Sequence, residues 1–397
     1  MTEAALSDIT VLETGQLIAG PFCGQMLGDF GATVIKVEDP RGGDPLRRWG
    51  RMKDGLSMWW PTLARNKRSV TLNLRDPEGQ AIAREMADKA DVMIENFRPG
   101  TVERWGLGWD ALSAANPGLV MVRVSGYGQT GPYKDRAGFG AVGEAMGGLR
   151  HVTGFPDRPP SRSGVSIGDS LTGLMATIGA LTALHARSRT GRGQMVDCAL
   201  YESVLAVMEG LISNYDLDGY VQPRTGAILA GVAPSNAYPC SDGRLVLIAG
   251  NKDEIYARLV AAMGEPERAT DPRYATHVAR GERVEEVDDH IAAWTVQRES
   301  AEVLRVMNEH AIPAGPINTA PEMLADPHFA AREAIVTVDD PTFGRLRTHG
   351  IFPKLSDTPG AFTRTGPSLG EHNEAIYGAW LGYGAARMAE LKGRGVI

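Results

Sequence analysis

Residues 9–38 read ITVLETGQLIAGPFCGQMLGDFGATVIKVE, and this stretch decides the fold class. It opens with the apolar run ITVLET (9–14) and closes with a second one, TVIKVE (33–38). Between them, a Gly20-Pro21 turn precedes FCGQMLGDFG, whose apolar residues recur with the period of a helix. Two β-rich runs joined by a helix indicate a βαβ unit, in which the two strands lie parallel.

The same alternation continues through the first half of the chain. A helix is expected at 77–90, where Pro77 stands near the first turn and its missing N–H costs no hydrogen bond. Further strands are expected at SVTLNL (69–74), DVMIENF (91–97) and LVMVRVSG (119–126). Strands that alternate with helices predict the α/β class, with a doubly wound parallel sheet.

The pattern changes after residue 170. Residues 170–212 are helical in pattern, interrupted by the turn TGRGQ (190–194), and a strand at GRLVLIAG (243–250) opens a new section. Residues 252–310 are mostly helical and more charged. We therefore expect a large α/β domain and a smaller α+β domain inserted into it. The expected boundaries are 1–200 and 330–397 for the first and 225–325 for the second, with linkers at 201–224 and 326–329.

Composition places the chain among soluble globular enzymes. Of its 397 residues 43% are hydrophobic and 22% charged, and a net charge of -7 without a Lys/Arg-rich run argues against a nucleic-acid partner. Cys23, Cys198 and Cys240 are far apart, so we expect no disulfide framework, no metal site and a cytoplasmic setting. The N-terminus lacks a signal-peptide pattern, and the apolar stretch 171–186 is broken by glycines, which favours a buried helix over a membrane span.

Two short patterns suggest chemistry that their surroundings do not support. GYGQTG (126–131) matches the dinucleotide fingerprint, but Pro132 and polar residues follow it instead of a helix, so a tight turn is expected. GVSIG (164–168) matches the nucleophile elbow of serine hydrolases, which requires a strand directly before it. Two prolines in the preceding DRPPSRS (157–163) exclude a central strand, so a hydrolase that uses Ser166 is the weaker alternative.

Asp169 directly follows Gly168 and precedes SLTGLMATIGALTALHA (170–186). An aspartate at this position is most often a helix cap, because its carboxylate accepts hydrogen bonds from free N–H groups. The same helix start favours a negative charge, and the Gly-rich approach lets a substrate come close. A carboxylate nucleophile needs both features, so Asp169 is the candidate catalytic residue.

Eight ordered blocks, spread over nearly the whole chain, carry a family resemblance. They are AGPFCGQMLGDFGATVIKVEDPRGGDPLR (19–47), NKRSVTLNLRDPEG (66–79), ENFRPGTVERWGLG (95–108), VSGYGQTGPYKDRAGF (124–139), GDSLTG (168–173), GRGQMVDCALYES (191–203), IPAGPINT (312–319) and PSLGEHN (367–373). Together they resemble the family III CoA-transferases, the group that includes formyl-CoA transferase and carnitine-CoA transferase.

This resemblance implies a fold and an activity. Members are homodimers of two interlocked, ring-like chains, with a Rossmann-like CoA-binding domain built from both ends of the chain. It also implies an enzyme that moves CoA from an acyl-CoA to a carboxylic acid through aspartyl-anhydride and aspartyl-CoA intermediates, with Asp169 of GDSLTG as nucleophile. CoA is then a substrate, and no permanently bound cofactor, metal or membrane partner is expected.

The resemblance also implies the CoA contacts, which fall in loops after successive strands. The expected contacts are Leu72, Asn73, Leu74 and Arg75 after the third strand, Asn96, Phe97 and Arg98 after the next, Arg104 beyond it, and Arg136, Ala137, Gly138 and Phe139.

Some positions depart from individual members. Ile18, which the resemblance places at the substrate site, stands where formyl-CoA transferase has Gln. LVLIAGNKDE (245–254) lacks the four-glycine loop of that enzyme, so formyl or oxalyl transfer is disfavoured. Asp39 replaces a basic residue that follows the second strand in many members, with Arg41 two positions on, which leaves that CoA contact open. Phe139 stands where the related 2-methylacyl-CoA racemases carry a proton-transferring His, and Phe cannot take a proton, so that alternative is also disfavoured. A non-catalytic CoA-binding module remains the third alternative.

The segment GGDPLRRWG (42–50) suggests a substrate class. Arg47 and Arg48 stand beside Trp49, and an arginine presents a planar fork that fits a carboxylate with two hydrogen bonds. One arginine could hold the distal carboxylate of a four- or five-carbon diacid while Trp59 or Trp60 covers its apolar linker. We therefore expect a dicarboxylic acid acceptor and succinyl-CoA as a donor. Surface charge or contact with a CoA phosphate is the competing interpretation of both arginines.

Overall fold

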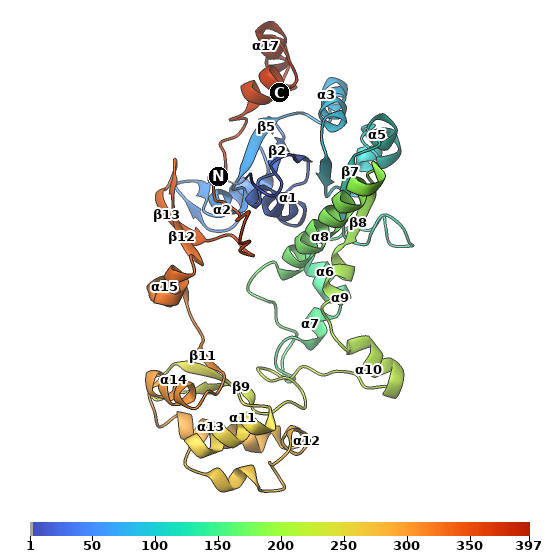
Figure 1. Cartoon of the computed structure of the whole chain (residues 1–397). Coiled ribbons are helices and arrows are strands. Elements are labelled where there is room, and N and C mark those ends of the chain that lie inside the picture. The colour runs from blue at the N-terminus through green and yellow to red at the C-terminus, as the bar shows by residue number, and fades with distance from the viewer. Residues whose placement is uncertain (1–2) are drawn as a thin grey trace. The chain divides into compact units, whose positions relative to one another are not determined.

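The computed structural model describes residues 3–397, which form two compact units (Figure 1). The large unit comprises the residues up to Leu149, Ser163–Ser213 and His328–Ile397, and the small unit comprises Arg150–Arg162 and Asn214–Pro327.

Residues 150–162 differ from the sequence-based division, which keeps them in the large domain. They lie in the small unit because their hydrogen bonds are there. The Gly226 N–H donates to the Gly154 carbonyl at 2.9 Å, and a His151 ring nitrogen lies 3.1 Å from the Gln222 carbonyl oxygen. Contacts between segments that are distant in sequence carry no local pattern, so the sequence alone did not reveal this assignment.

A six-stranded sheet forms the centre of the large unit, and every neighbouring pair is parallel. Its order is β5 (Lys67–Thr71), β2 (Thr33–Glu38), β1 (Thr10–Glu13), β6 (Val92–Glu95), β7 (Val120–Ser125) and β8 (Met195–Ala199). The expected α/β class with a Rossmann-like parallel sheet is confirmed. The order reverses between β1 and β6, and ligands of such sheets bind at the carboxyl ends of the strands beside this reversal.

Strand β8 corrects the sequence analysis, which places residues 195–199 in a helical segment. Gly191, in the left-handed conformation at φ +70°, ends the preceding helix, and Met195–Ala199 then pairs with β7. A five-residue run is too short to show a period, so pairing with a neighbouring strand decides its structure.

Apolar side chains alternate between the two faces of the sheet. Val11, Val34 and Val92 face helices α1 (Ala19–Asp29) and α8 (Ile167–Thr190), while Leu12, Ile35 and Met93 face the other layer. That second layer is made of α3 (Pro77–Asp88), α5 (Trp109–Ala115) and the C-terminal helices η3 (Glu374–Trp380) and α17 (Ala385–Gly393). Gly20 and Pro21 lie inside the first turn of α1 rather than in a separate turn, because Pro needs no N–H bond there.

Helix α8 is the one helix of the described chain that is long and apolar enough, by length and composition, to cross a membrane. Its Ala176, Ala180 and Ala183 are buried against the sheet, as expected for a core helix. The other side of α8 presents Leu174, Ile178 and Leu181, which are exposed in the single chain.

Short helices and strands complete the large unit. They are η1 (Pro45–Arg48), β3 (Met52–Lys53), β4 (Leu56–Ser57), α2 (Trp60–Leu63), α4 (Thr101–Arg104), α6 (Gly140–Met146), α9 (Leu200–Leu205), β12 (Ile335–Asp340) and β13 (Gly344–His349). Three further helices, α7 (Leu149–Val152), α10 (Leu211–Asp218) and α16 (Pro327–Ala331), contain residues of both units.

The small unit is α+β. Its antiparallel sheet has the order β11 (Ala314–Pro316), β10 (Leu245–Ala249), β9 (Ser235–Pro239). Tyr238, Val246 and Ile248 pack in one core with residues of α11 (Asp253–Ala262), α13 (Val284–Thr295) and α14 (Ser300–Glu309). The short helices η2 (Pro266–Ala269), α12 (His277–Gly281) and α15 (Ala320–Ala325) complete the unit.

A buried ionic network joins the carboxyl ends of β1, β2 and the start of β5. Glu13, fully buried, accepts hydrogen bonds from Lys36 at 3.0 Å and from Lys67 at 2.7 Å. Lys36 also pairs with Asp44 at 2.7 Å. Burial alone would lower the pKa of Lys36, but the attraction of Asp44 and Glu13 outweighs it and the pKa is raised. Two carboxylates and two ammonium groups therefore balance one another in the core.

Replacement of Glu13 by Gln should lower the free energy of unfolding of the large unit by about 3–5 kcal/mol, because two buried lysines lose their shared carboxylate. Chemical denaturation followed by circular dichroism measures this change. Glu333→Gln, which removes an exposed pair with Lys354, is the control and should leave the unfolding midpoint unchanged. Equal midpoints for wild type and Glu13→Gln would contradict this role of the network.

Candidate active site

Asp169 is the third residue of α8, whose cap residue Ser166 makes no side-chain capping bond. Its carboxylate lies directly against Gly140, the first residue of α6: an ideal Cβ added to Gly140 would lie 2.6 Å from Cγ of Asp169 and 3.0 Å from Oδ1. The starts of two helices therefore meet at this carboxylate, and the N-terminal end of a helix stabilises a negative charge.

The loop after β1 reaches the same region. On α8, Gly173 lies one turn after Asp169, and a Cβ there would lie 2.9 Å from the Ala19 carbonyl oxygen at the start of α1. Ile18, expected at the substrate site, is the N-cap of α1 and makes no side-chain capping bond. The first N–H groups of α1 have no partner within that helix. The structure thus brings Ile18 and Asp169 to adjacent helix starts.

The loop between Glu13 and Ile18 is held from two sides. The Asn96 side chain accepts from the Gln16 N–H at 2.8 Å and donates to the Gln16 carbonyl at 2.7 Å, across the reversal between β1 and β6. Leu17 has a left-handed backbone with φ +65°, and its N–H donates to Asp44 at 3.0 Å. Such strained residues persist where surrounding bonds over-determine them, and they concentrate at functional sites.

The expected CoA contacts after β5 lie at the carboxyl edge of the sheet. Leu72 is buried, and its N–H donates to the Glu38 carbonyl at 2.7 Å, while Asn73 N–H donates to the carbonyl of Val396. Leu74 packs against the core, and the exposed Arg75 bonds Asp39 at 2.8 Å.

The carboxylate of Asp39, the residue that departs from many family members, bonds both Arg75 and Arg41. Hydrogen bonds from Arg41 lower the pKa of Asp39, against the effect of burial, and Arg75 adds to the decrease. Asp39 thus holds two exposed arginines beside one another at the ends of β2 and β5.

The loop after β6 is also fixed by a buried acid. The Glu95 carboxylate accepts from Arg123 at 2.7 Å and from the Phe97 N–H at 2.8 Å, and the Phe97 ring packs edge-on against Trp105. Burial raises the pKa of Glu95 to about 7 despite the attraction of Arg123. Arg98 and Arg104, also expected to contact CoA, are exposed beyond this loop.

The loop after β7 carries the last group of expected contacts, which includes Ala137. It is closed by a glycine pair: a Cβ on Gly126 would lie 2.7 Å from the Gly138 Cα. Arg136 stacks on the Tyr133 ring, with its guanidinium carbon 3.5 Å from the ring centroid. Phe139, 58% exposed, is the N-cap of α6 and directly precedes Gly140. Its side chain has no titrating group, whereas the resemblance places the proton-transferring His of the racemases at this position.

Arg47 and Arg48 differ in their surroundings. The Arg47 guanidinium bonds Glu38 at 2.7 Å, donates to the Pro367 carbonyl at 3.1 Å and stacks on Trp60. Arg48 is exposed, and its side chain makes no hydrogen bond or ion pair within residues 3–397. Only Arg48 is therefore available to a ligand without breaking a buried pair.

The two rival motifs lack the geometry that their chemistry requires. Gly128 and Gly131 have left-handed backbones in a run of turns, and the next helix begins only at Gly140. No strand leads directly into Ser166, which lies just before α8 and after an irregular segment. Among the described residues, no group of three or more His, Cys, Asp or Glu side chains is placed to hold a metal ion.

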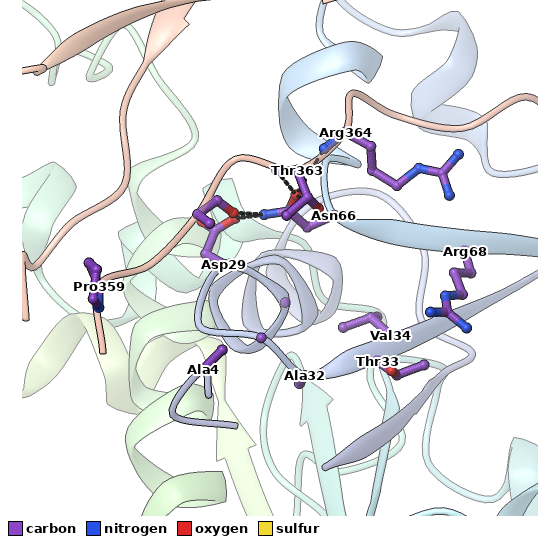
Figure 2. A pocket seen from close by; sticks show the side chains of 13 residues that line it. Ala4, Asp29, Ala32, Thr33, Val34, Asn66, Arg68, Pro359, Thr363 and Arg364 are labelled. Carbon is purple, nitrogen blue, oxygen red and sulfur yellow. Dashed lines mark hydrogen bonds between the residues drawn. The ribbon is translucent and has the colours of Figure 1, made fainter. Parts of the chain in front are cut away.

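A cavity of about 260 Å³ lies at the opposite, amino edge of the sheet, near the starts of β2 and β5 (Figure 2). The Asp29 carboxylate on its wall accepts hydrogen bonds from Arg65 at 2.6 Å and from the Asn66 amide at 2.8 Å. Asn66 also accepts from the Thr363 N–H at 2.9 Å. These bonds fasten the C-terminal segment to the sheet, and the cavity contains none of the expected site residues.

A family model described as CoA-transferase family III matches residues 6–373. The chain belongs to this family. Succinyl-CoA–D-citramalate CoA-transferase of Chloroflexus aurantiacus is 56% identical, over 99% of this chain and 98% of that protein. The beta subunit of succinyl-CoA–L-malate CoA-transferase from the same organism is 42% identical, over 100% and 99% respectively.

A crystal structure described as a CAIB/BAIF family protein from Brucella suis is similar with a TM-score of 0.83 and 35% identity, over 95% of this chain and 100% of that chain. Taken with the family match, these likenesses establish this protein as a CoA-transferase with the fold of its family.

Sequence reasoning missed Gly140 and Glu144. Glu144 is buried on α6 and accepts a long hydrogen bond, 3.4 Å, from the Gly168 N–H. Neither residue belongs to a recognisable motif, because their importance comes only from the contact between α6 and α8. The segment AGFGAVGE (137–144) is glycine-rich at its start but contains no other pattern that indicates a functional site.

Proposed function

We propose that this CoA-transferase moves CoA from succinyl-CoA to a four- or five-carbon dicarboxylic acid, with Asp169 as the covalent carrier. The placement of Asp169 carries the proposal: a carboxylate at a helix start, packed on Gly140 at the carboxyl edge of a parallel sheet. The names of the two Chloroflexus relatives support succinyl-CoA as donor and a dicarboxylate as acceptor.

The first half-reaction transfers CoA to the enzyme. An Asp169 oxygen attacks the thioester carbon, the C–S bond breaks, and the products are a succinyl-aspartyl anhydride and CoA thiolate. The thiolate then attacks Cγ of Asp169 and expels succinate, which leaves an aspartyl-CoA thioester. No proton or electron is gained or lost in these steps.

The second half-reaction repeats this chemistry with the acceptor. The acceptor carboxylate attacks Cγ of Asp169 and releases the thiolate, forming a second anhydride. The thiolate then attacks the acceptor acyl carbon, and Asp169 leaves as a free carboxylate. CoA must remain bound throughout, since the thiolate is used twice. Backbone N–H groups at the glycine-rich helix starts are suited to stabilise each oxyanion.

Arg48 is the residue we propose to hold the distal carboxylate of the diacid. Its guanidinium is exposed beside Trp49, whereas Arg47 is occupied by Glu38 and Pro367.

The three cysteines, buried and unpaired, fit the reducing cytoplasmic setting that the sequence predicts.

Association into a homodimer is part of the same proposal. Two helices that contact each other expose large apolar side chains: Val142 and Met146 on α6, and Leu174, Ile178 and Leu181 on α8. A single chain rarely leaves such a face open to water, and the family resemblance indicates a second copy of this chain as its cover.

Replacement of Asp169 by Ala should abolish CoA transfer, because no carboxylate remains to accept the acyl group, while CoA still binds. Steady-state assays with succinyl-CoA and calorimetry with CoA measure the two properties. Ser166→Ala is the matched control at the same helix start and should stay active. The reverse pattern, with Asp169→Ala active and Ser166→Ala dead, would exclude this mechanism.

Arg48→Met should raise KM for succinate or glutarate by roughly tenfold to a hundredfold, the effect of losing one charged hydrogen-bonded pair. A monocarboxylate of equal length should be nearly unaffected. Arg47→Met should instead lower stability, because it leaves Glu38 buried without its partner. An equal rise of KM for both kinds of acid with Arg48→Met counts against a distal-carboxylate site.

Light scattering on dilute protein should give about twice the chain mass of 42.6 kDa. Ile178→Glu should reduce that mass, because it places a charge in the apolar face. A wild-type protein that is monomeric and fully active would rule out the proposed assembly.

A further inference from the structure

Gly140 lies directly against the carboxyl group of Asp169. The three atoms nearest to an added Cβ at this position all belong to the Asp169 carboxyl group. The Gly140 backbone is not in the left-handed region, so an alanine could adopt it. Glycine is therefore required here by space alone.

Neighbouring residues show the same close approach of α6 to α8. A Cβ on Gly168 would lie 2.9 Å from the Gly140 carbonyl oxygen and 3.0 Å from Cγ of Glu144. Glu144, 1% exposed, accepts from the Gly168 N–H. The backbones of the two helix starts thus meet without side chains between them, and Glu144 bridges them one turn further along α6.

We propose that Gly140 is a positioning residue, whose lack of a side chain sets the orientation of the Asp169 carboxylate, with Glu144 holding the two helix starts together. This inference rests on the proposed role of Asp169 as carrier. It adds the requirement for a glycine at position 140, which cannot be seen from the family motif GDSLTG or from the helix start.

The contact restricts how the reaction can approach Asp169. Gly140 covers one face of the carboxyl group, so the thiolate and the acceptor must both reach Cγ from the other face. A methyl group at position 140 would push the carboxylate toward that open face. Each of the four transfer steps would then start from a displaced group, and a displacement of about 1 Å costs roughly a hundredfold in rate.

The first test compares Gly140→Ala with Gly164→Ala. Gly164 lies five residues before Asp169, has no atom within 4 Å of an added Cβ and is not in the left-handed region. With succinyl-CoA and succinate or glutarate, Gly140→Ala should lower kcat about a hundredfold and leave KM for succinyl-CoA within about twofold. Gly164→Ala should match wild type. Equal kcat values for the two variants would overturn the inference.

A double-mutant cycle provides a readout that does not depend on activity. Gly140→Ala should lower the Tm of wild type, and the same substitution in Asp169→Ala should lower it far less, because the clashing carboxylate is gone. Equal Tm shifts in both backgrounds would overturn the positioning role. Full CoA transfer by Asp169→Ala would instead refute the proposed function. The Tm shifts of the cycle would still show whether Gly140 and Asp169 are in contact.

Discussion

The pairing of Glu13 with Lys36 and Lys67 is the constraint on which the rest of the large unit depends. Three charged side chains without access to water must satisfy one another, and their pairing ties the carboxyl ends of β1 and β2 to the start of β5. Lys67 also donates to the Pro21 carbonyl at 2.6 Å and Lys36 to that of Gly15 at 2.9 Å. The network therefore fixes both ends of the loop that leads into α1, and Asp44 extends it to the strained Leu17.

The proposed mechanism depends on this rigidity, because a carboxylate nucleophile has no inherent direction. Asp169 sits where the starts of α1, α6 and α8 converge, and each start reaches that point from the carboxyl edge of the same sheet. Glycines at 140, 168 and 173 allow backbone to meet backbone or carboxylate there. The sheet and its buried charges thus hold the helix starts that surround Asp169.

Much of this could be predicted from the sequence, and the exceptions have a common cause. The strands of the βαβ units and the helix at Asp169 are encoded in local periodicity, although β5 ends at Thr71 rather than at the expected residue 74. Strand β8, the assignment of residues 150–162 and the pairing of Arg47 with Glu38 depend on partners distant in sequence. Gly140 is the clearest case, since its neighbour Asp169 is 29 residues away in the chain and an isolated glycine carries no pattern. Family resemblance indicated Asp169 as the candidate nucleophile but not its contact with Gly140.

The most direct test of the central claim is to trap the enzyme after it has reacted with succinyl-CoA and to locate the modified residue. Hydroxylamine converts an aspartyl-CoA thioester or an aspartyl anhydride into a hydroxamate, which peptide mass spectrometry can assign to one side chain. The account predicts a hydroxamate on Asp169 alone, formed only when an acyl-CoA is present and absent from Asp169→Ala. A modification on Ser166, or turnover of succinyl-CoA with no covalent adduct under conditions that trap rapid intermediates, would contradict it.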